Sequence, residues 1–338
     1  MRRTELDLCR ITGCLMVLII HVGAEIYHNV PLESMEFALL NFISTSVRGG
    51  VPIFFMLTGA LMLSRESMDI KKLMKNHALF LVEIFLLWSL IYTLIRGALA
   101  GDFGSAYDFI YSVISGHYHM WFIPTMVLCY FFVPPAHAAI HGHRLDAKYL
   151  LWMMFLLVLL PANMNLTPDT APILFKITQH FDFFYLPYMA YVIWGWWLST
   201  RQMPKCTPWL APLVFLLVCI VTSAGNHWYS FYKGTADGWL FSYFSLSNFI
   251  EATAVFCFFL AMKDRKFKHP GLIARLADCT LGVYLIHPMM INLLEKLGLE
   301  ITPDAPVSGL LIMFAVLAAS CFGLVFIAKR IPVVKKLL

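Results

Sequence analysis

The sequence predicts an all-α membrane protein, a polytopic bundle of about ten transmembrane helices, and two observations support this fold class. First, 60% of the 338 residues are hydrophobic and only 13% are charged, whereas soluble proteins carry about 25% charged residues. The mean hydropathy is correspondingly high, at +0.73. Second, apolar runs of about 20 residues, the length that crosses a bilayer, recur along the chain. We expect a single domain over residues 1–338, because the spans leave no room for a sizeable soluble domain.

The apolar runs place the ten predicted spans. The ten ranges are 8–28, 36–63, 78–97, 119–136, 148–162, 184–200, 207–224, 243–262, 278–295 and 306–328. The second range contains Gly49, Gly50 and Pro52, so we expect a broken or kinked helix there, and the fourth contains Pro124. Broken helices at membrane depth are tolerated where they line a cavity.

The basic residues predict the orientation of the helices, because cytoplasmic loops carry an excess of lysine and arginine. With the N-terminus inside, most of the 25 lysines and arginines fall in cytoplasmic segments. The exceptions in outer segments are Arg96, Lys176, Lys233 and Lys296. Arg10 and Arg48 lie at or within spans. Both termini are therefore predicted to be cytoplasmic.

Composition also argues against several partners. The net charge of +5 comes mainly from the cytoplasmic loops, so it does not indicate nucleic acid. The eight cysteines are scattered and form no CxxC pair, so we expect neither a disulfide framework nor a zinc site. His137, His141 and His143 cluster in a polar loop without an acid or cysteine beside them, so we expect no metal. Whether the protein is a homo-oligomer is left open.

Arg10 and His21 are the most informative pair, because both lie in an apolar run that is long enough to enter a bilayer. Eleven residues of helix amount to three turns plus roughly 20°, so both side chains project from one face, about 16 Å apart along the axis. That distance is about half the hydrocarbon thickness. Ionisable groups at such depth are costly and usually mark a polar cavity. The first helix is therefore predicted to form one wall of a site.

Two acids accompany this pair at helical spacing, Asp7 three residues before Arg10 and Glu25 four residues after His21. A histidine can take a proton from a hydroxyl nucleophile and return it to a leaving group. An arginine can bind a phosphate or carboxylate. The alternative is that Arg10 extends to the membrane surface and His21 only packs. Charged and titratable groups together on one face favour the functional interpretation.

A second segment, residues 48–59, combines Arg48, two glycines, a proline and Thr58. Glycine lets backbones approach closely, and a proline break frees polar backbone groups. The Thr58 hydroxyl is a candidate donor into a cavity. A helix-packing segment rich in small residues explains the spacing equally well.

A third segment is basic and lies on the predicted cytoplasmic side, where Lys71, Lys72 and Lys75 follow one another closely. These ammonium groups suit the phosphates of a nucleotide-like donor. The positive-inside rule or anionic lipid explains them too, and charge alone favours that simpler explanation.

Two further segments place histidines among aromatic residues. His119 and Trp121 lie at the predicted outer end of the fourth span, where aromatic residues form an interfacial belt. They also suit an acceptor site that faces outward. His287 follows Tyr284 by three residues, so the two share a helix face, and the next residue is a proline. A hydrogen bond between helices is the alternative role for that pair.

Glu83 and Glu251 are predicted inside spans. A carboxyl group at that depth needs a partner or must be neutral. Spacing alone names no partner for either residue.

Taken in order, these segments resemble the motifs of the acyltransferase-3 family of membrane acyltransferases. The family's first helix carries Arg or Lys, ten residues, then His, which matches Arg10 to His21. Its Phe-Phe-x-x-Ser-Gly motif matches residues 54–59 with Thr58 in place of serine, and its Arg-x-x-Arg stretch is matched by Lys72 and Lys75. Its His-x-Trp-Phe and Gly-x-Tyr-Leu-x-His motifs match residues 119–122 and 282–287. The matches cover nearly the whole chain. The chain is most similar to the short members of the family, those without a fused periplasmic domain.

The resemblance implies an O-acetyltransferase of the bacterial inner membrane that modifies polysaccharide. It implies that an acetyl or other acyl group moves from cytoplasmic acyl-CoA to a hydroxyl of an envelope glycan or glycolipid. It also implies that His21 is the essential histidine and that Arg10 and the cations Arg48, Lys71, Lys72 and Lys75 help to bind the donor.

Together with the residue spacing, the resemblance supports a fuller hypothesis. His21 is the general base or acyl carrier, Arg10 and Glu25 belong to the catalytic group, and Thr58 lies at the donor. The acceptor is bound by His119, Trp121, Tyr284 and His287.

The residues leave other functions open. A transporter or flippase for a small polar or glycolipid substrate would use the same buried charges as a pathway. A non-catalytic sensor, or an enzyme that acylates a small molecule, fits as well. The acyl chain is acetyl by family expectation alone, and succinyl or longer chains remain alternatives.

Overall fold

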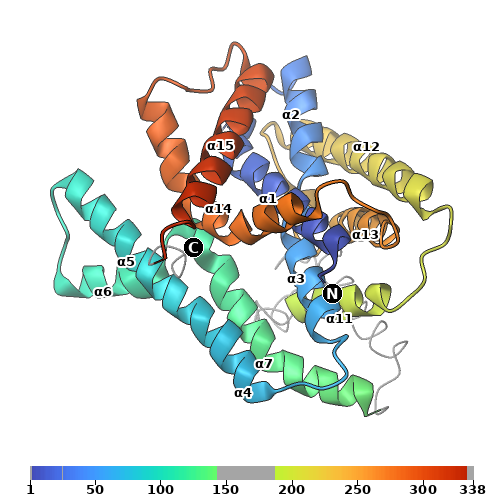
Figure 1. Cartoon of the computed structure of the whole chain (residues 1–338). Helices are drawn as coiled ribbons and strands as arrows, with labels where there is room; N and C mark the ends of the chain where they lie inside the picture. Colours follow the sequence, from blue (N-terminus) through green and yellow to red (C-terminus); the bar gives the residue numbers. More distant parts are fainter. Residues whose placement is uncertain (1, 25, 143–186, 333–338) are drawn as a thin grey trace, which may run out of the picture.

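The computed structural model describes residues 2–24, 26–142 and 187–332 (Figure 1). The regular elements in these ranges are all helical, which confirms the predicted all-α membrane bundle. Seven helical stretches in this part of the chain are long and apolar enough to cross a membrane, namely Thr4–Gly23, Met35–Met62, Ile70–Ala100, Tyr118–His141, Thr207–Lys233, Pro270–Lys296 and Pro306–Ala328. Each overlaps a span predicted from the sequence.

The helices are α1 (Thr4–Gly23), α2 (Met35–Ser46), α3 (Gly50–Met62), α4 (Ile70–Leu73), α5 (Phe80–Ala100), α6 (Ala106–Ser115), α7 (Phe122–His141), α11 (Pro187–Ser199), α12 (Thr207–Lys233), α13 (Leu246–Leu260), α14 (Pro270–Lys296) and α15 (Pro306–Ala328). A π-helical segment, Met74–Leu79, joins α4 to α5, and short 3₁₀ turns occur at Ile26–His28, Tyr118–Trp121 and Trp239–Phe241.

Two predicted spans correspond to shorter helices, 184–200 to α11 and 243–262 to α13. The predicted span 148–162 lies outside the described residues. The count of ten helices and the cytoplasmic termini therefore stay predictions. In Figure 1, α12 and α13 lie on one side of α1, and α5, α6 and α7 lie on the other. Helix α1 packs against α3, α14 and α15, so it occupies the centre of the bundle.

The second long span is broken in the middle, as its glycines and proline predict. Helix α2 ends at Ser46 and α3 begins at Gly50. Pro52 lies in the first turn of α3, where its missing N–H costs no helical hydrogen bond. The Gly49 N–H donates to Oε1 of Glu251 on α13 at 3.3 Å. Glu251 is only 2% exposed, and a buried carboxyl group needs hydrogen-bond donors. The Gly49 N–H is one such donor.

Pro124 and Glu83 are both predicted inside spans, and the structure shows where each of them lies. Pro124 lies in the first turn of α7, directly after the 3₁₀ turn, so it does not interrupt the helix. Glu83 lies near the start of α5 and is exposed at the surface of the bundle. Its carboxyl group is therefore not a buried group of the helix interior.

Helix α6 was not predicted as a separate element. A capping box between Ser105 and Asp108 fixes its first turn. None of its residues is buried, and large side chains such as Tyr107, Ile110 and Tyr111 are exposed. A short helix with an exposed apolar face is typical of one that lies along a membrane surface.

Glycines bring α3 very close to the helices on both of its sides. Towards α1, a Cβ atom on Gly50 would lie 2.8 Å from Cβ of Met16. Towards α11, a Cβ atom on Gly59 would lie 1.7 Å from the carbonyl oxygen of Val192, and one on Gly195 would meet the backbone of α3 at 2.1 Å. Because backbone atoms cannot move aside as side chains do, only glycine permits these crossings.

We expect Gly59→Ala to destabilise the protein by more than about 3 kcal/mol, since the new methyl group would overlap the Val192 carbonyl and force α11 away from α3. Gly323→Ala on α15 is the matched control, because nothing lies within 4 Å of the added Cβ. The midpoint of thermal unfolding in detergent, followed by tryptophan fluorescence, measures both effects. Equal midpoints for the two variants would contradict this account of the crossing.

The predicted orientation can be tested with the one exposed cysteine, Cys206, since the other seven are buried or half-buried. A membrane-impermeant maleimide should label Cys206 in inside-out vesicles and leave it unlabelled in right-side-out vesicles. Lys233→Cys in a Cys206→Ser background should show the opposite pattern, because Lys233 lies at the far end of α12. Labelling of Cys206 in right-side-out vesicles would reverse the orientation.

Candidate functional site

Side chains from α1, α3, α7 and α14 enclose a pocket of about 390 Å³. Arg10 and His21 both line it, so they share one face of α1, as their spacing predicts. Four more of the predicted site residues line the same pocket, namely Thr58, His119, Trp121 and Tyr284. The predicted site residues outside its lining are Arg48, Lys71, Lys72, Lys75 and His287. Glu25 lies outside the described residues.

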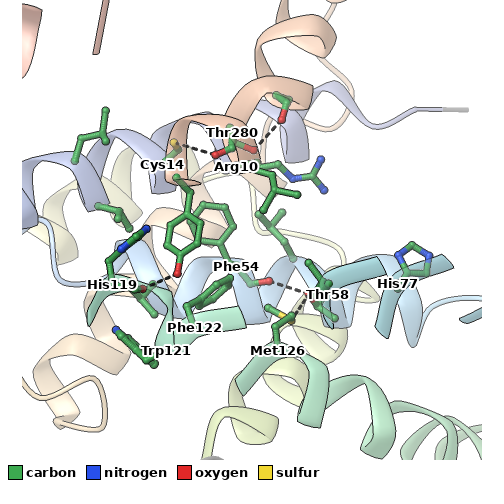
Figure 2. Close-up of a pocket in the computed structure, with 18 of the residues that line it drawn as sticks. Arg10, Cys14, Phe54, Thr58, His77, His119, Trp121, Phe122, Met126 and Thr280 are labelled. Atoms are coloured by element: carbon green, nitrogen blue, oxygen red, sulfur yellow. Dashed lines mark hydrogen bonds between the residues drawn. The ribbon is translucent and has the colours of Figure 1, made fainter. Parts of the chain in front are cut away.

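The two ends of the pocket both carry histidine. His77 lies at one end, and His119 and Trp121 lie at the other (Figure 2). Arg10 lines the wall that α1 and α14 form, where Asp278 of α14 also takes part. A molecule in this pocket would meet imidazole rings at both ends and the Arg10 guanidinium group on the wall between α1 and α14.

Arg10 keeps most of its charge free for a ligand. Its Nη1 lies 3.8 Å from Oδ1 of Asp7, the spacing expected on a helix, but Asp7 binds Arg2 more closely, with Nε 2.5 Å from Oδ2. Arg2 also lies 2.8 Å from Asp278, and hydrogen bonds to Asp278 and Asp7 raise the pKa of Arg2 above its ordinary value. The Asp7 carboxylate is thus mainly neutralised by Arg2. Sequence spacing alone allows Asp7 to pair with Arg10 but does not reveal the competition from Arg2.

His21 lies among aromatic rings at the histidine-rich part of the pocket. Its ring centroid is 4.7 Å from that of His287 and 5.7 Å from that of Tyr118. Within the described ranges, no hydrogen bond to the His21 ring is found. The ring is therefore in contact with the pocket and available to a substrate.

His119 is 1% exposed and tightly placed by its neighbours. Its Nδ1 lies 2.8 Å from Nδ1 of His117, and its backbone carbonyl accepts a hydrogen bond from the Tyr284 hydroxyl at 2.6 Å. The rings of His119 and His287 meet edge to face at 5.2 Å. No group of three or more His, Cys, Asp or Glu residues that could hold a metal ion occurs in the part of the chain that the structure describes.

Trp121 and Thr58 form two sides of the same pocket. The Trp121 ring stacks on Tyr243, with centroids 5.7 Å apart. The Thr58 hydroxyl donates to the Phe54 carbonyl of its own helix at 3.0 Å and lies 3.5 Å from the Met126 sulfur (Figure 2). A ligand would receive a hydrogen bond from Thr58 only if the hydroxyl left Phe54.

Arg48 lies in the break between α2 and α3 and not beside the predicted lysines. Its guanidinium carbon is 4.3 Å from the centroid of the Phe241 ring. Its buried Nε has no hydrogen-bond partner among the described residues. Arg48 is therefore held against Phe241, outside the lining of the pocket.

The lysine segment contributes to the site through a residue that the sequence did not single out. Lys71, Lys72 and Lys75 are exposed and form no ion pair within the described ranges. His77 of the same segment lines the pocket and stacks on Tyr130, with centroids 5.5 Å apart. The π-helical turn at Met74–Leu79 sets this arrangement. No sequence pattern distinguishes such a turn from an ordinary helix.

The fold and the pocket together define an integral membrane protein whose helix bundle encloses a mainly apolar pocket with a few charged and titratable side chains. The chain belongs to the acyltransferase-3 family, because the family model, described as an acyltransferase domain, matches residues 3–329. This confirms the family that the sequence motifs resemble. No curated protein and no solved structure matches the chain.

Proposed function

We propose that the protein is an integral membrane O-acyltransferase that moves an acyl group, acetyl by expectation, from cytoplasmic acyl-CoA to a hydroxyl of an envelope glycan or glycolipid. Membership of the family supports acyl transfer. The observation that carries the assignment is that Arg10 and His21, the first-helix pair, line one pocket together with residues of three other family motifs, Thr58, His119 and Tyr284.

The donor enters from the side of Arg10 in this proposal. The exposed cations at Lys71, Lys72 and Lys75 attract the phosphates of CoA from solution. Arg10 pairs with an anionic group of the donor, since the Asp7 carboxylate is held mainly by Arg2. The acyl thioester then extends along the apolar part of the pocket toward His21.

The acceptor approaches from the other end, beside His119, Trp121 and Tyr284. His21 takes the proton from the acceptor hydroxyl as its oxygen attacks the thioester carbonyl carbon. The C–S bond breaks, the new C–O bond forms, and the proton passes from His21 to the thiolate of CoA. A variant of this route, in which His21 carries the acyl group between donor and acceptor, uses the same geometry.

We expect His21→Ala to abolish acetylation of envelope glycan in cells, a loss of at least about 10²-fold, because a general base is worth that much or more. His28→Ala is the matched control, an exposed histidine just beyond the end of α1. Mass spectrometry of the glycan measures acetylation, and immunoblotting checks protein levels. Full acetylation by His21→Ala at normal protein levels would contradict the catalytic role.

The proposed donor site is tested by the triple variant Lys71→Gln, Lys72→Gln, Lys75→Gln. We expect about tenfold weaker binding of acetyl-CoA, since each exposed charge contributes a fraction of a kcal/mol, and the difference should shrink as salt is added. Binding of an acetyl-pantetheine thioester, which lacks phosphate, should not change.

The control for this experiment removes three other exposed cations that are predicted to lie on the same side of the membrane, Lys263, Lys266 and Lys268. Isothermal titration of detergent-purified protein gives the affinities. Equal weakening in both triple variants would show that the Lys71–Lys75 cations act through overall charge alone.

A further inference from the structure

His287 lies inside α14 and is 0% exposed. The proline that follows it determines which nitrogen of the His287 ring carries the hydrogen. Pro288 has no N–H, so the carbonyl of Tyr284, four residues earlier, lacks its helical donor. Within a membrane such a carbonyl needs another partner. The His287 side chain provides it, with Nδ1 at 2.7 Å from the Tyr284 carbonyl oxygen.

This hydrogen bond determines where the proton of the ring lies. A carbonyl oxygen only accepts hydrogen bonds, so Nδ1 of His287 must carry the hydrogen. In the neutral imidazole, Nε2 then carries a lone pair and can only accept. That Nε2 atom is buried and has no hydrogen-bond partner among the described residues. A buried acceptor without a donor is costly, which indicates that a donor occupies this position during function.

Two imidazole rings surround His287 and could supply that donor. His21 is nearer, at 4.7 Å between centroids, and His119 lies at 5.2 Å. The neighbouring hydroxyl groups are already engaged, since Tyr284 donates to the His119 carbonyl and Tyr92 donates to the Leu285 carbonyl at 2.8 Å. The His119 ring is held at Nδ1 by His117, while its buried Nε2 has no hydrogen-bond partner among the described residues, so His21 is favoured over His119 by its shorter centroid distance to His287. The His21 ring makes no competing hydrogen bond within the described ranges.

We propose that His287 is the positioning residue of His21, with Nε2 of His287 accepting an N–H from the His21 ring. This inference rests on the proposed function, in which His21 is the reacting histidine. It makes His287 a partner of the general base, His21, and not one of the residues that bind the acceptor. The resulting chain runs from the Tyr284 carbonyl through His287 to His21 and on to the substrate.

This series of hydrogen bonds gives His21 the protonation state that a general base needs, with one nitrogen that carries no hydrogen. When one nitrogen of neutral His21 donates to His287, the other nitrogen must carry a lone pair, which can accept the proton of a hydroxyl group bound in the pocket that His21 lines. After His21 takes the proton from the acceptor hydroxyl, both of its nitrogens carry hydrogen, and the bond to His287 becomes charge-assisted and stronger. The positioning residue thus stabilises the protonated state of His21, as an acid does in a Ser-His-Asp triad.

Three substitutions at His287 separate positioning from helix stabilisation. His287→Asn keeps a donor near the position of Nδ1 for the Tyr284 carbonyl but does not reach His21. His287→Gln carries an acceptor near the position of Nε2. His287→Phe keeps the ring and lacks both groups. If His287 only repairs the helix, His287→Asn should perform at least as well as His287→Gln.

We expect kcat to fall about 10²-fold in His287→Asn and His287→Phe, the low end of the range for a general base, with an unchanged KM for acetyl-CoA. His287→Gln should remain within about tenfold of the wild-type protein. His227→Asn on α12 is the control, because His227 packs on Phe37 away from the pocket. Equal kcat values for the Asn and Gln variants, or a loss confined to KM, would overturn the proposal.

A second measurement is independent of activity. In wild-type protein with ¹⁵N-labelled histidine, solid-state NMR should show Nδ1 of His287 protonated and Nε2 unprotonated but hydrogen-bonded. His21→Phe should remove the hydrogen-bond shift of Nε2, whereas His119→Phe should leave it in place. The reverse result would assign the donor to His119 and overturn the proposal. If the protein transfers no acyl group, the proposed function fails, while this spectrum still decides whether His21 and His287 are bonded.

Discussion

The close packing of α3 between α1 and α11 is the constraint on which the site depends. Gly50 permits the contact with Met16 of α1, and Gly59 and Gly195 permit the contact with α11. These crossings set the distance of α3 from α1 and α11, and the pocket-lining face of α3 lies opposite the face of α1 that carries Arg10 and His21. The glycine of the Phe-Phe-x-x-Thr-Gly segment therefore acts through helix packing, while the neighbouring threonine lines the pocket.

A second theme is the satisfaction of polar groups where no water is available. The N–H freed at the α2–α3 break finds Glu251, and the carbonyl freed by Pro288 finds the ring of His287. Each repair holds a buried titratable side chain in a defined orientation, and His287 is thereby kept next to His21 and His119. Irregular backbone and buried titratable side chains thus occur together because each satisfies a polar group of the other.

Much of this organisation could be predicted from the sequence. Hydrophobic run length gave the membrane bundle, and helical periodicity placed Arg10 and His21 on one face. Glycine and proline chemistry located the break in the second span. The sequence did not place His77 in the pocket, because a π-helical turn shifts the register of its segment. It also grouped Arg48 with the lysines by charge, whereas the break carries Arg48 to Phe241.

The sequence by itself determined the fold class, the broken helix and the shared face of the first-helix pair, because these depend on local geometry and on the length of apolar runs. Only the tertiary structure decided which partners meet: Asp7 with Arg2, Glu251 with Gly49, and His21 with His287. Such pairings join residues from helices that are distant in the chain or compete for one partner. They are set by how closely the helices pack, which no local pattern encodes.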